Sequence, residues 1–119
     1  MDSGKMAFKI VEILDEKKAQ NIDLLDIKDV SLLADYFVIC SGNSATQIKA
    51  LSDAVEEKLG EIGYFPKHKE GYSSARWILL DYGEVVVHIF HHESRAFYNL
   101  ERLWSDAQHV DIESIVNRV

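Results

Sequence analysis

The chain has 119 residues, 47% of them hydrophobic and 28% charged, which is the composition of an ordinary globular protein. Its net charge of −7 and its lack of a dense basic stripe argue against tight binding to DNA or to an RNA backbone. No apolar stretch approaches the roughly 18 residues of a membrane span, and the N-terminus lacks the basic and apolar regions of a secretory signal.

The acidic charge instead suits a basic protein partner, because complementary charge speeds association and excludes wrong partners. Cys40 is the only cysteine, so no internal disulfide can form, and this usage fits a reducing cytoplasm. Because Cys40 lies in an apolar run, we expect a buried, inert thiol. No repeat, low-complexity tract or Pro/Gly-rich linker divides the chain, so residues 1–119 are expected to form one domain.

The first half of the chain predicts a helix followed by two strands. Residues 6–20 are expected to be helical because their apolar residues recur at helical spacing. Residues 21–27 alternate imperfectly between apolar and polar side chains and are expected to form a short strand. Residues 36–40, Tyr-Phe-Val-Ile-Cys, are rich in β-formers and have the length of a central buried strand.

A second helix is expected to begin near Ser44. Ser44 and Gln47 have the spacing of a capping box, in which each side chain satisfies a backbone N–H at the helix start. Apolar residues then repeat at intervals of three or four until Gly63, which is expected to end the helix. Pro66 cannot donate a backbone hydrogen bond, so residues 64–69 are predicted to form an edge strand.

A β-hairpin is predicted next, over residues 75–81 and 84–90. Tyr82-Gly83 joins these β-rich runs, and glycine supplies the positive φ that a tight turn needs. Ser94 is expected to cap a last helix that reaches Trp104, followed by a polar tail in which residues 111–117 could form a short helix. This order of elements predicts an α+β fold: a mixed β-sheet with flanking helices.

The turn Ser41-Gly42-Asn43-Ser44 joins a strand to a helix, which is the shape of a phosphate-binding loop. A Walker loop would carry a lysine before its Ser or Thr, and none is present. A nucleotidyltransferase would need paired carboxylates on a neighbouring strand to hold two metal ions, and no Asp-x-Asp or Asp-x-Glu pair follows on a strand. Asp81 and Glu84 flank the hairpin turn, where acidic residues are ordinary. We therefore expect no phosphoryl transfer.

Three histidines lie close together in the sequence, at positions 88, 91 and 92, with Glu93 beside them. They make a poor tetrahedral set because 88 and 91 point to opposite faces of a strand, so we expect no bound metal and no cofactor. His91 and His92 are expected to flank the last helix, and His88 to lie on the exposed or partner-facing side of the hairpin. No Gly-x-Ser-x-Gly elbow is present, which argues against a serine hydrolase.

Alternation along the hairpin places Trp77, Leu79 and Asp81 on one face. Val86, His88 and Phe90 share one face of the next strand. If helices cover only the other face of the sheet, Trp77 and Leu79 form a binding patch, since Trp and Arg are favoured hot-spot residues. The alternative is that helices cover both faces, as in many α/β proteins.

Three runs carry a resemblance to a known family: "ADYFVICSGNSATQIKAL", "GYSSARWILLDYGEVVVHIF" and "RAFYNLERLW". Together they resemble the ribosomal silencing factor family, also called the Iojap family, over about residues 6–112, leaving a short polar C-terminal tail. The resemblance implies a nucleotidyltransferase-like fold that lacks the catalytic carboxylates, and therefore a protein that is not an enzyme.

The resemblance also implies a function. Members bind the large ribosomal subunit through large-subunit protein fourteen, sterically block joining of the small subunit and so repress translation when nutrients are limiting. It further implies a cytoplasmic protein that is a homodimer when free. Two alternatives remain open: a large-subunit assembly factor that uses the same surface, and a nucleotide-binding or nucleotidyltransferase-like enzyme.

The family pattern also suggests which residues meet the partner. Its Trp-Ile-Leu-Leu-Asp run falls on residues 77–81, its histidine on His88, and its Arg-x-Phe-Tyr run on residues 95–98. The expected partner-binding residues are Trp77, Leu79, Asp81, His88 and Tyr98, with Arg76 and Glu93 on the rim.

Overall fold

The computed structural model describes residues 1–93 and 105–116 of the chain. The strands of these residues form one sheet in the order β3-β4-β5-β2-β1-β6, with β2 and β5 parallel at its centre and the other pairs antiparallel. The elements are α1 (Ser3–Glu16), β1 (Gln20–Asp26), β2 (Tyr36–Gly42), α2 (Ala45–Glu61), β3 (His68–Glu70), β4 (Trp77–Asp81), β5 (Val85–His91) and β6 (Gln108–His109). The predicted α+β class with a mixed sheet is confirmed.

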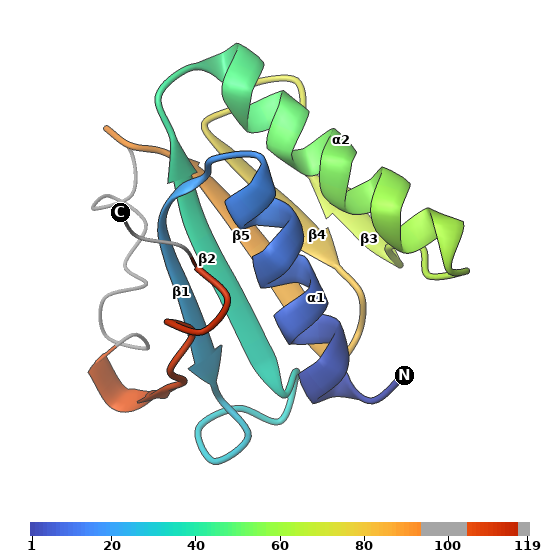
Figure 1. Cartoon of the computed structure of the whole chain (residues 1–119), viewed down its shortest axis with the longest axis vertical. Coiled ribbons are helices and arrows are strands. Elements are labelled where there is room, and N and C mark those ends of the chain that lie inside the picture. Colours follow the sequence, from blue (N-terminus) through green and yellow to red (C-terminus); the bar gives the residue numbers. More distant parts are fainter. Residues whose placement is uncertain (94–104, 117–119) are drawn as a thin grey trace.

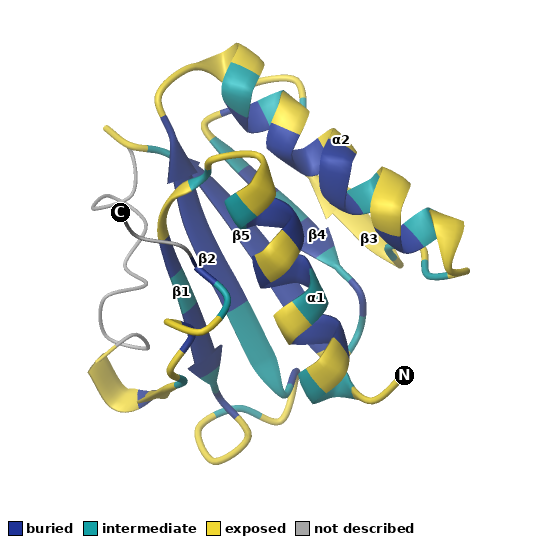
Figure 2. Ribbon diagram, in the orientation of Figure 1, coloured by how far each residue is buried: buried dark blue, intermediate teal, exposed yellow. Residues whose placement is uncertain are grey.

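Both described helices lie side by side on the same face of the sheet (Figure 1). Each helix packs an apolar stripe against the sheet, where alternate apolar side chains of the strands, such as Val38, Val87 and Ile89, belong to the same buried core. Figure 2 shows the result: the central strands and the inner sides of the helices are buried, and the outer sides of the helices are exposed. Within the described residues, neither helix is long and apolar enough to cross a membrane.

The first helix ends four residues earlier than the sequence predicts. Lys18 adopts a left-handed backbone, with φ of 64°, and the Ala19 N–H donates back to the Leu14 carbonyl at 2.9 Å. This bond closes the helix as a glycine cap would, but with a lysine in the left-handed position, so no glycine marks the end in the sequence.

The second helix begins as predicted. The Ser44 hydroxyl accepts a hydrogen bond from the Gln47 N–H at 3.1 Å, and Gln47 Oε1 accepts one from the Asn43 N–H at 2.7 Å. The two side chains therefore satisfy two backbone donors reciprocally. The predicted edge strand is present, but it is shorter and later than residues 64–69, because β3 spans only His68–Glu70 at the edge of the sheet and Pro66 precedes it.

The C-terminal region differs from the prediction. Residues 108–109, expected in a polar tail, form β6, which pairs with Leu25 and Asp26 at the far edge of the sheet. The strand is short, polar and exposed, so it carries no periodic signal. Residues 111–116 form a single turn around the Ile112 carbonyl and not the short helix expected there. The helix predicted to start at Ser94 lies outside the described residues.

The predicted hairpin joins β4 to β5, and Gly83 has the expected positive φ of 93°. A second glycine with positive φ, Gly71, precedes β4 and lies directly against its first residue. A Cβ atom built on Gly71 would lie 1.9 Å from the Trp77 carbonyl oxygen, a separation that no packing allows. Gly63 also has positive φ, but a Cβ there would meet nothing within 4 Å.

We therefore expect Gly71→Ala to destabilise the fold far more than the matched Gly63→Ala. Both variants carry a left-handed alanine, which costs about 1 to 2 kcal/mol. Gly71→Ala must in addition displace the backbone of β4, and we expect its free energy of unfolding to fall by at least about 2 kcal/mol more. Urea denaturation measures both values. Equal losses would mean that the close approach at Gly71 does not constrain the fold.

Candidate functional site

The sheet face away from the helices carries its own apolar cluster. Cross-strand register brings Trp77 opposite Phe90 and Leu79 opposite His88, and it places Ile39 of β2 beside His88 on the other side. Directly paired residues share a face, so the alternation predicted for both hairpin strands is confirmed. The buried members of this cluster are Leu25, Ile27, Ala34, Ile39, Val86, Phe90 and Ala107.

Four rings, Phe37, Trp77, His88 and Phe90, form what we call the aromatic cluster. The Trp77 and Phe90 rings stack with centroids 5.3 Å apart and planes 21° apart, and the Phe37 and His88 centroids are 4.5 Å apart. The Trp77 and His88 centroids are 5.8 Å apart. Such pairs contribute about 0.5–1.5 kcal/mol each beyond simple burial, so the cluster holds its members in fixed orientations.

His88 is the polar member of the aromatic cluster. Its side chain is only 3% exposed, and its Nδ1 accepts a hydrogen bond from the Trp77 Nε1–H at 3.0 Å. Burial lowers the pKa of His88 from 6.5 to about 4, because a charged imidazolium would lose its hydration. The hydrogen bond from Trp77 favours the same neutral form, since only an unprotonated nitrogen can accept it. The expected face of His88 is therefore right, but its expected exposure is wrong.

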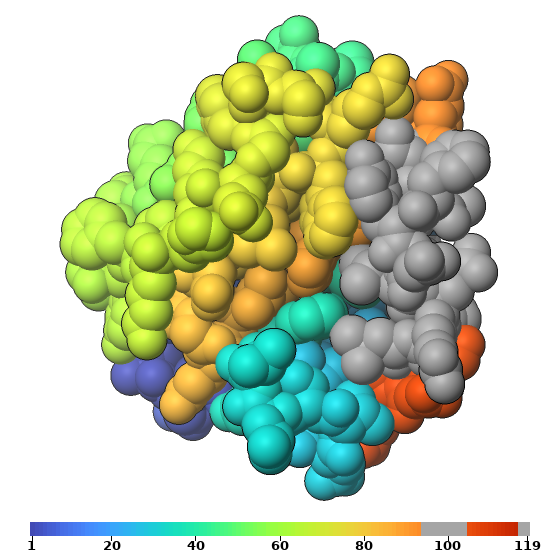
Figure 3. All heavy atoms as spheres, turned by 180° about the vertical axis from the view of Figure 1, so that it is seen from behind, coloured from blue at the N-terminus to red at the C-terminus, as the bar shows by residue number. Residues whose placement is uncertain are grey.

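Trp77 and Leu79 are partly exposed, whereas their neighbours on this face are buried. Both are half-buried and pack against the buried cluster, whereas Ile39 and Phe90 are buried completely or nearly so. Figure 3 views the molecule from this side, and atoms of β4 and β5 reach the surface near its centre. The two side chains therefore present an apolar surface on a rigid support, which is the form of an interface hot spot.

The remaining predicted site residues are Asp81, Arg76, Glu93 and Tyr98. Asp81 is on the same face, but its Oδ1 accepts a hydrogen bond from the Gly83 N–H at 2.7 Å and so stabilises the hairpin turn. Arg76 is exposed next to Trp77, and Glu93 is exposed beyond the end of β5. Tyr98 lies outside the described residues. A contact role for any of these residues stays a prediction.

Sequence reasoning missed Phe37 and did not assign a role to Phe90. Phe37 lies in an apolar run whose alternate residues could equally face the helices, and its pairing with Leu25 and Val86 shows which face it takes. Phe90 was assigned to the correct face by alternation, and its stacking on Trp77 follows from a register that a hairpin turn at Tyr82-Gly83 already implies.

The turn at residues 41–44 has the outline of a phosphate-binding loop, but the chain uses some of its N–H groups internally. Those of Asn43 and Gln47 are bonded to the capping-box side chains. Of the carboxylates that follow, Glu56 pairs with Lys69 and Asp53 accepts a hydrogen bond from the Tyr72 hydroxyl at 3.1 Å. Among the residues that the structure describes, no three His, Cys, Asp or Glu side chains are grouped as a metal site would require.

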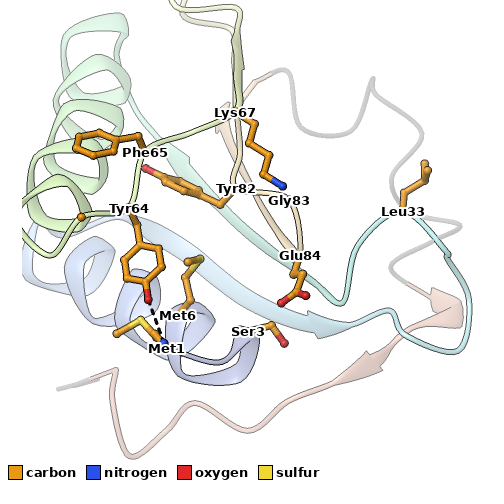
Figure 4. Close-up of a pocket in the computed structure, with 11 residues that line it drawn as sticks. Met1, Ser3, Met6, Leu33, Tyr64, Phe65, Lys67, Tyr82, Gly83 and Glu84 are labelled. Atoms are coloured by element: carbon orange, nitrogen blue, oxygen red, sulfur yellow. Dashed lines mark hydrogen bonds between the residues drawn. The ribbon is translucent and has the colours of Figure 1, made fainter.

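A separate hollow of about 700 Å³ lies near the N-terminus (Figure 4). The N-terminal ammonium group donates a hydrogen bond to the Tyr64 hydroxyl at 3.0 Å, and exposed Phe65 forms part of the rim. Tyr82 lies beneath, and burial raises the pKa of its phenol. The polar groups around this hollow do not converge on a common point in Figure 4, so it has no arrangement that implies a particular ligand.

The state of His88 predicts how stability depends on pH. The unfolded chain takes up a proton at this residue below about pH 6.5, whereas the folded chain does so only near pH 4. The free energy of unfolding is therefore highest above pH 6.5 and falls as the pH drops toward 4, because only the unfolded chain binds the extra proton in this range. Between pH 7 and 4.5, we expect the free energy of unfolding of wild type to fall by about 2–3 kcal/mol more than that of His88→Asn. Urea denaturation at the two pH values measures both. Parallel losses would contradict a buried neutral His88.

Comparison with known proteins places these features in a family. The model of the family described as "Ribosomal silencing factor during starvation" matches residues 1–119. The protein named "Ribosomal silencing factor RsfS" of Halalkalibacterium halodurans is 46% identical over 117 residues, covering 98% of this chain and 100% of the relative. The protein of that name in Bacillus subtilis is 45% identical, covering 87% of this chain and 88% of the relative.

Solved structures of proteins with similar sequences share the fold of this chain. A crystal structure of a Chromobacterium violaceum protein superposes with a TM-score of 0.84 at 33% identity, covering 88% of each chain. One from Bacillus halodurans gives a TM-score of 0.79 at 41% identity, covering 92% of this chain and 99% of that one. A more distant relative, "Protein Iojap, chloroplastic" of Zea mays, is 35% identical over 89% of this chain and 46% of its own length. The chain belongs to the ribosomal silencing factor family, which also includes the Iojap proteins.

Proposed function

We propose that this chain is a translational repressor that binds the large ribosomal subunit through large-subunit protein fourteen. The observation that carries the proposal is the partly open pair Trp77 and Leu79, which lies on the sheet face that neither described helix covers, in a chain of the ribosomal silencing factor family. The pair is apolar and rigidly supported, as a hot spot requires.

The charge of the chain supports the same partner. Ribosomal proteins are generally basic, and this chain has a net charge of −7. Opposite charge accelerates the encounter, while the central apolar contact determines how long the complex lasts. Arg76 and Glu93 are both exposed, and we propose that they make the rim contacts that set orientation.

The proposed mechanism is steric exclusion. A factor bound on the face of the large subunit that meets the small subunit occupies volume that the small subunit needs, so each bound factor removes one large subunit from the active pool. This mechanism needs neither catalysis nor a nucleotide. The family description places silencing during starvation, and we infer a cytoplasmic protein that is a homodimer when free. An assembly factor would use the same surface but would not block joining of mature subunits.

We expect Trp77→Ala and Leu79→Ala each to weaken binding to purified large subunits at least tenfold, or about 1.4 kcal/mol. Each substitution removes apolar area from the centre of the proposed contact. Co-sedimentation measures binding, and addition of small subunits measures joining. The control is Phe8→Ala, which truncates an aromatic residue of α1, 37% exposed on the helix-covered side. It should bind and silence like wild type.

Each possible result has a distinct meaning. If wild type fails to bind large subunits, the proposed function is wrong. If wild type binds but does not prevent joining of mature subunits, the assembly role replaces repression. If Phe8→Ala loses binding while Trp77→Ala keeps it, the docking surface lies on the helical side.

A further inference from the structure

Among the described residues, a ring stack and a hydrogen bond both act on the orientation of the Trp77 side chain. The face of the indole stacks on Phe90, and its Nε1–H donates to His88 Nδ1 at 3.0 Å. Stacking alone lets the indole slide across Phe90 or rotate within the plane of its own ring, because a contact between two flat rings does not fix a direction in that plane. The hydrogen bond removes this freedom, since it attaches one edge of the indole to one atom.

His88 is not placed to touch a partner itself. Only 3% of it is exposed, and three aromatic rings surround it within about 6 Å of its own centroid. A rigid partner surface could not reach it without displacing the aromatic cluster. Its effect on docking must therefore act through a neighbour, and Trp77 is the partly exposed neighbour to which it is hydrogen-bonded.

The chemistry of the bond also specifies the form of the histidine. An indole N–H can only donate, so the nitrogen that faces it must be the unprotonated one, and the proton of the neutral ring lies on Nε2. Among the described residues, Nε2 is buried and has no hydrogen-bond partner. A buried N–H donor without a partner destabilises the fold. The ring therefore contributes through the bond at Nδ1 and not through its own burial.

We propose that His88 is a positioning residue: by accepting the Trp77 Nε1–H at Nδ1, it holds the indole in the orientation that docks on the partner. The inference rests on the proposed function, and it assigns to His88 an indirect role in place of the expected direct contact. An indole that is already oriented loses less rotational freedom on binding. We expect this pre-ordering to strengthen docking about threefold to tenfold.

The test compares two substitutions of His88. His88→Leu replaces the imidazole by an apolar side chain of similar size that has no acceptor. In His88→Asn, the amide Oδ1 is bonded to Cγ, as Nδ1 is in histidine, and it can accept the hydrogen bond. We expect His88→Leu to bind large subunits about threefold to tenfold more weakly than wild type, and His88→Asn to recover most of the loss. Equal losses in the two variants would overturn the proposal, because burial alone would then explain them.

A double-mutant cycle with Trp77→Phe separates positioning from contact. Phenylalanine keeps an aromatic ring but cannot donate, so in this background His88→Leu should change binding less than twofold. If the effects of Trp77→Phe and His88→Leu are instead additive, His88 acts independently of Trp77 and the proposal falls.

A direct readout of the hydrogen bond does not need the ribosome. The chain has two tryptophans, so the indole N–H signals in a ¹⁵N-correlated NMR spectrum are assigned by Trp77→Phe alone. We expect the Trp77 signal of wild type to exchange with solvent at least tenfold more slowly than that of His88→Leu. Equally fast exchange overturns the hydrogen bond. If this signal is protected but wild type does not bind large subunits, the proposed function fails while the Trp77–His88 link stands.

Discussion

The parallel pairing of β2 with β5 is the constraint on which the rest of the structure depends. Seven residues of each strand are in register, and a parallel pair cannot be closed by a tight turn. The intervening chain must cross over the sheet, and α2 is part of that crossover. Because α1 packs beside α2 on the same side, neither of the described helices covers the opposite face.

The same pairing unites two parts of the candidate site that are far apart in sequence. It places Phe37 beside Val86 and Ile39 beside His88, so the rings contributed by the hairpin rest against a strand that precedes α2. The two faces of the sheet then differ in kind. The helical face is an ordinary closed core, whereas the other face combines a buried floor with the partly open Trp77 and Leu79.

Local signals in the sequence were sufficient for much of this architecture. Alternation placed Trp77, Leu79 and His88 on one face, and the Ser44–Gln47 spacing located the start of α2. What local signals could not supply was strand order, which decides the face of Phe37, the pairing of β6 and the burial of His88. Each of these depends on a neighbour that is distant in the chain, and a single sequence does not encode such pairings in any local pattern.

The depressed pKa of His88 has a consequence for the living cell. With a pKa of about 4, the imidazole stays almost entirely uncharged when the pH falls from 7 to 6. Histidine is the side chain by which proteins ordinarily sense such acidification. Here it is kept outside that range, so the aromatic cluster keeps one chemical form while metabolism shifts the internal pH. Protonation of His88 is therefore not a switch for this face near neutral pH.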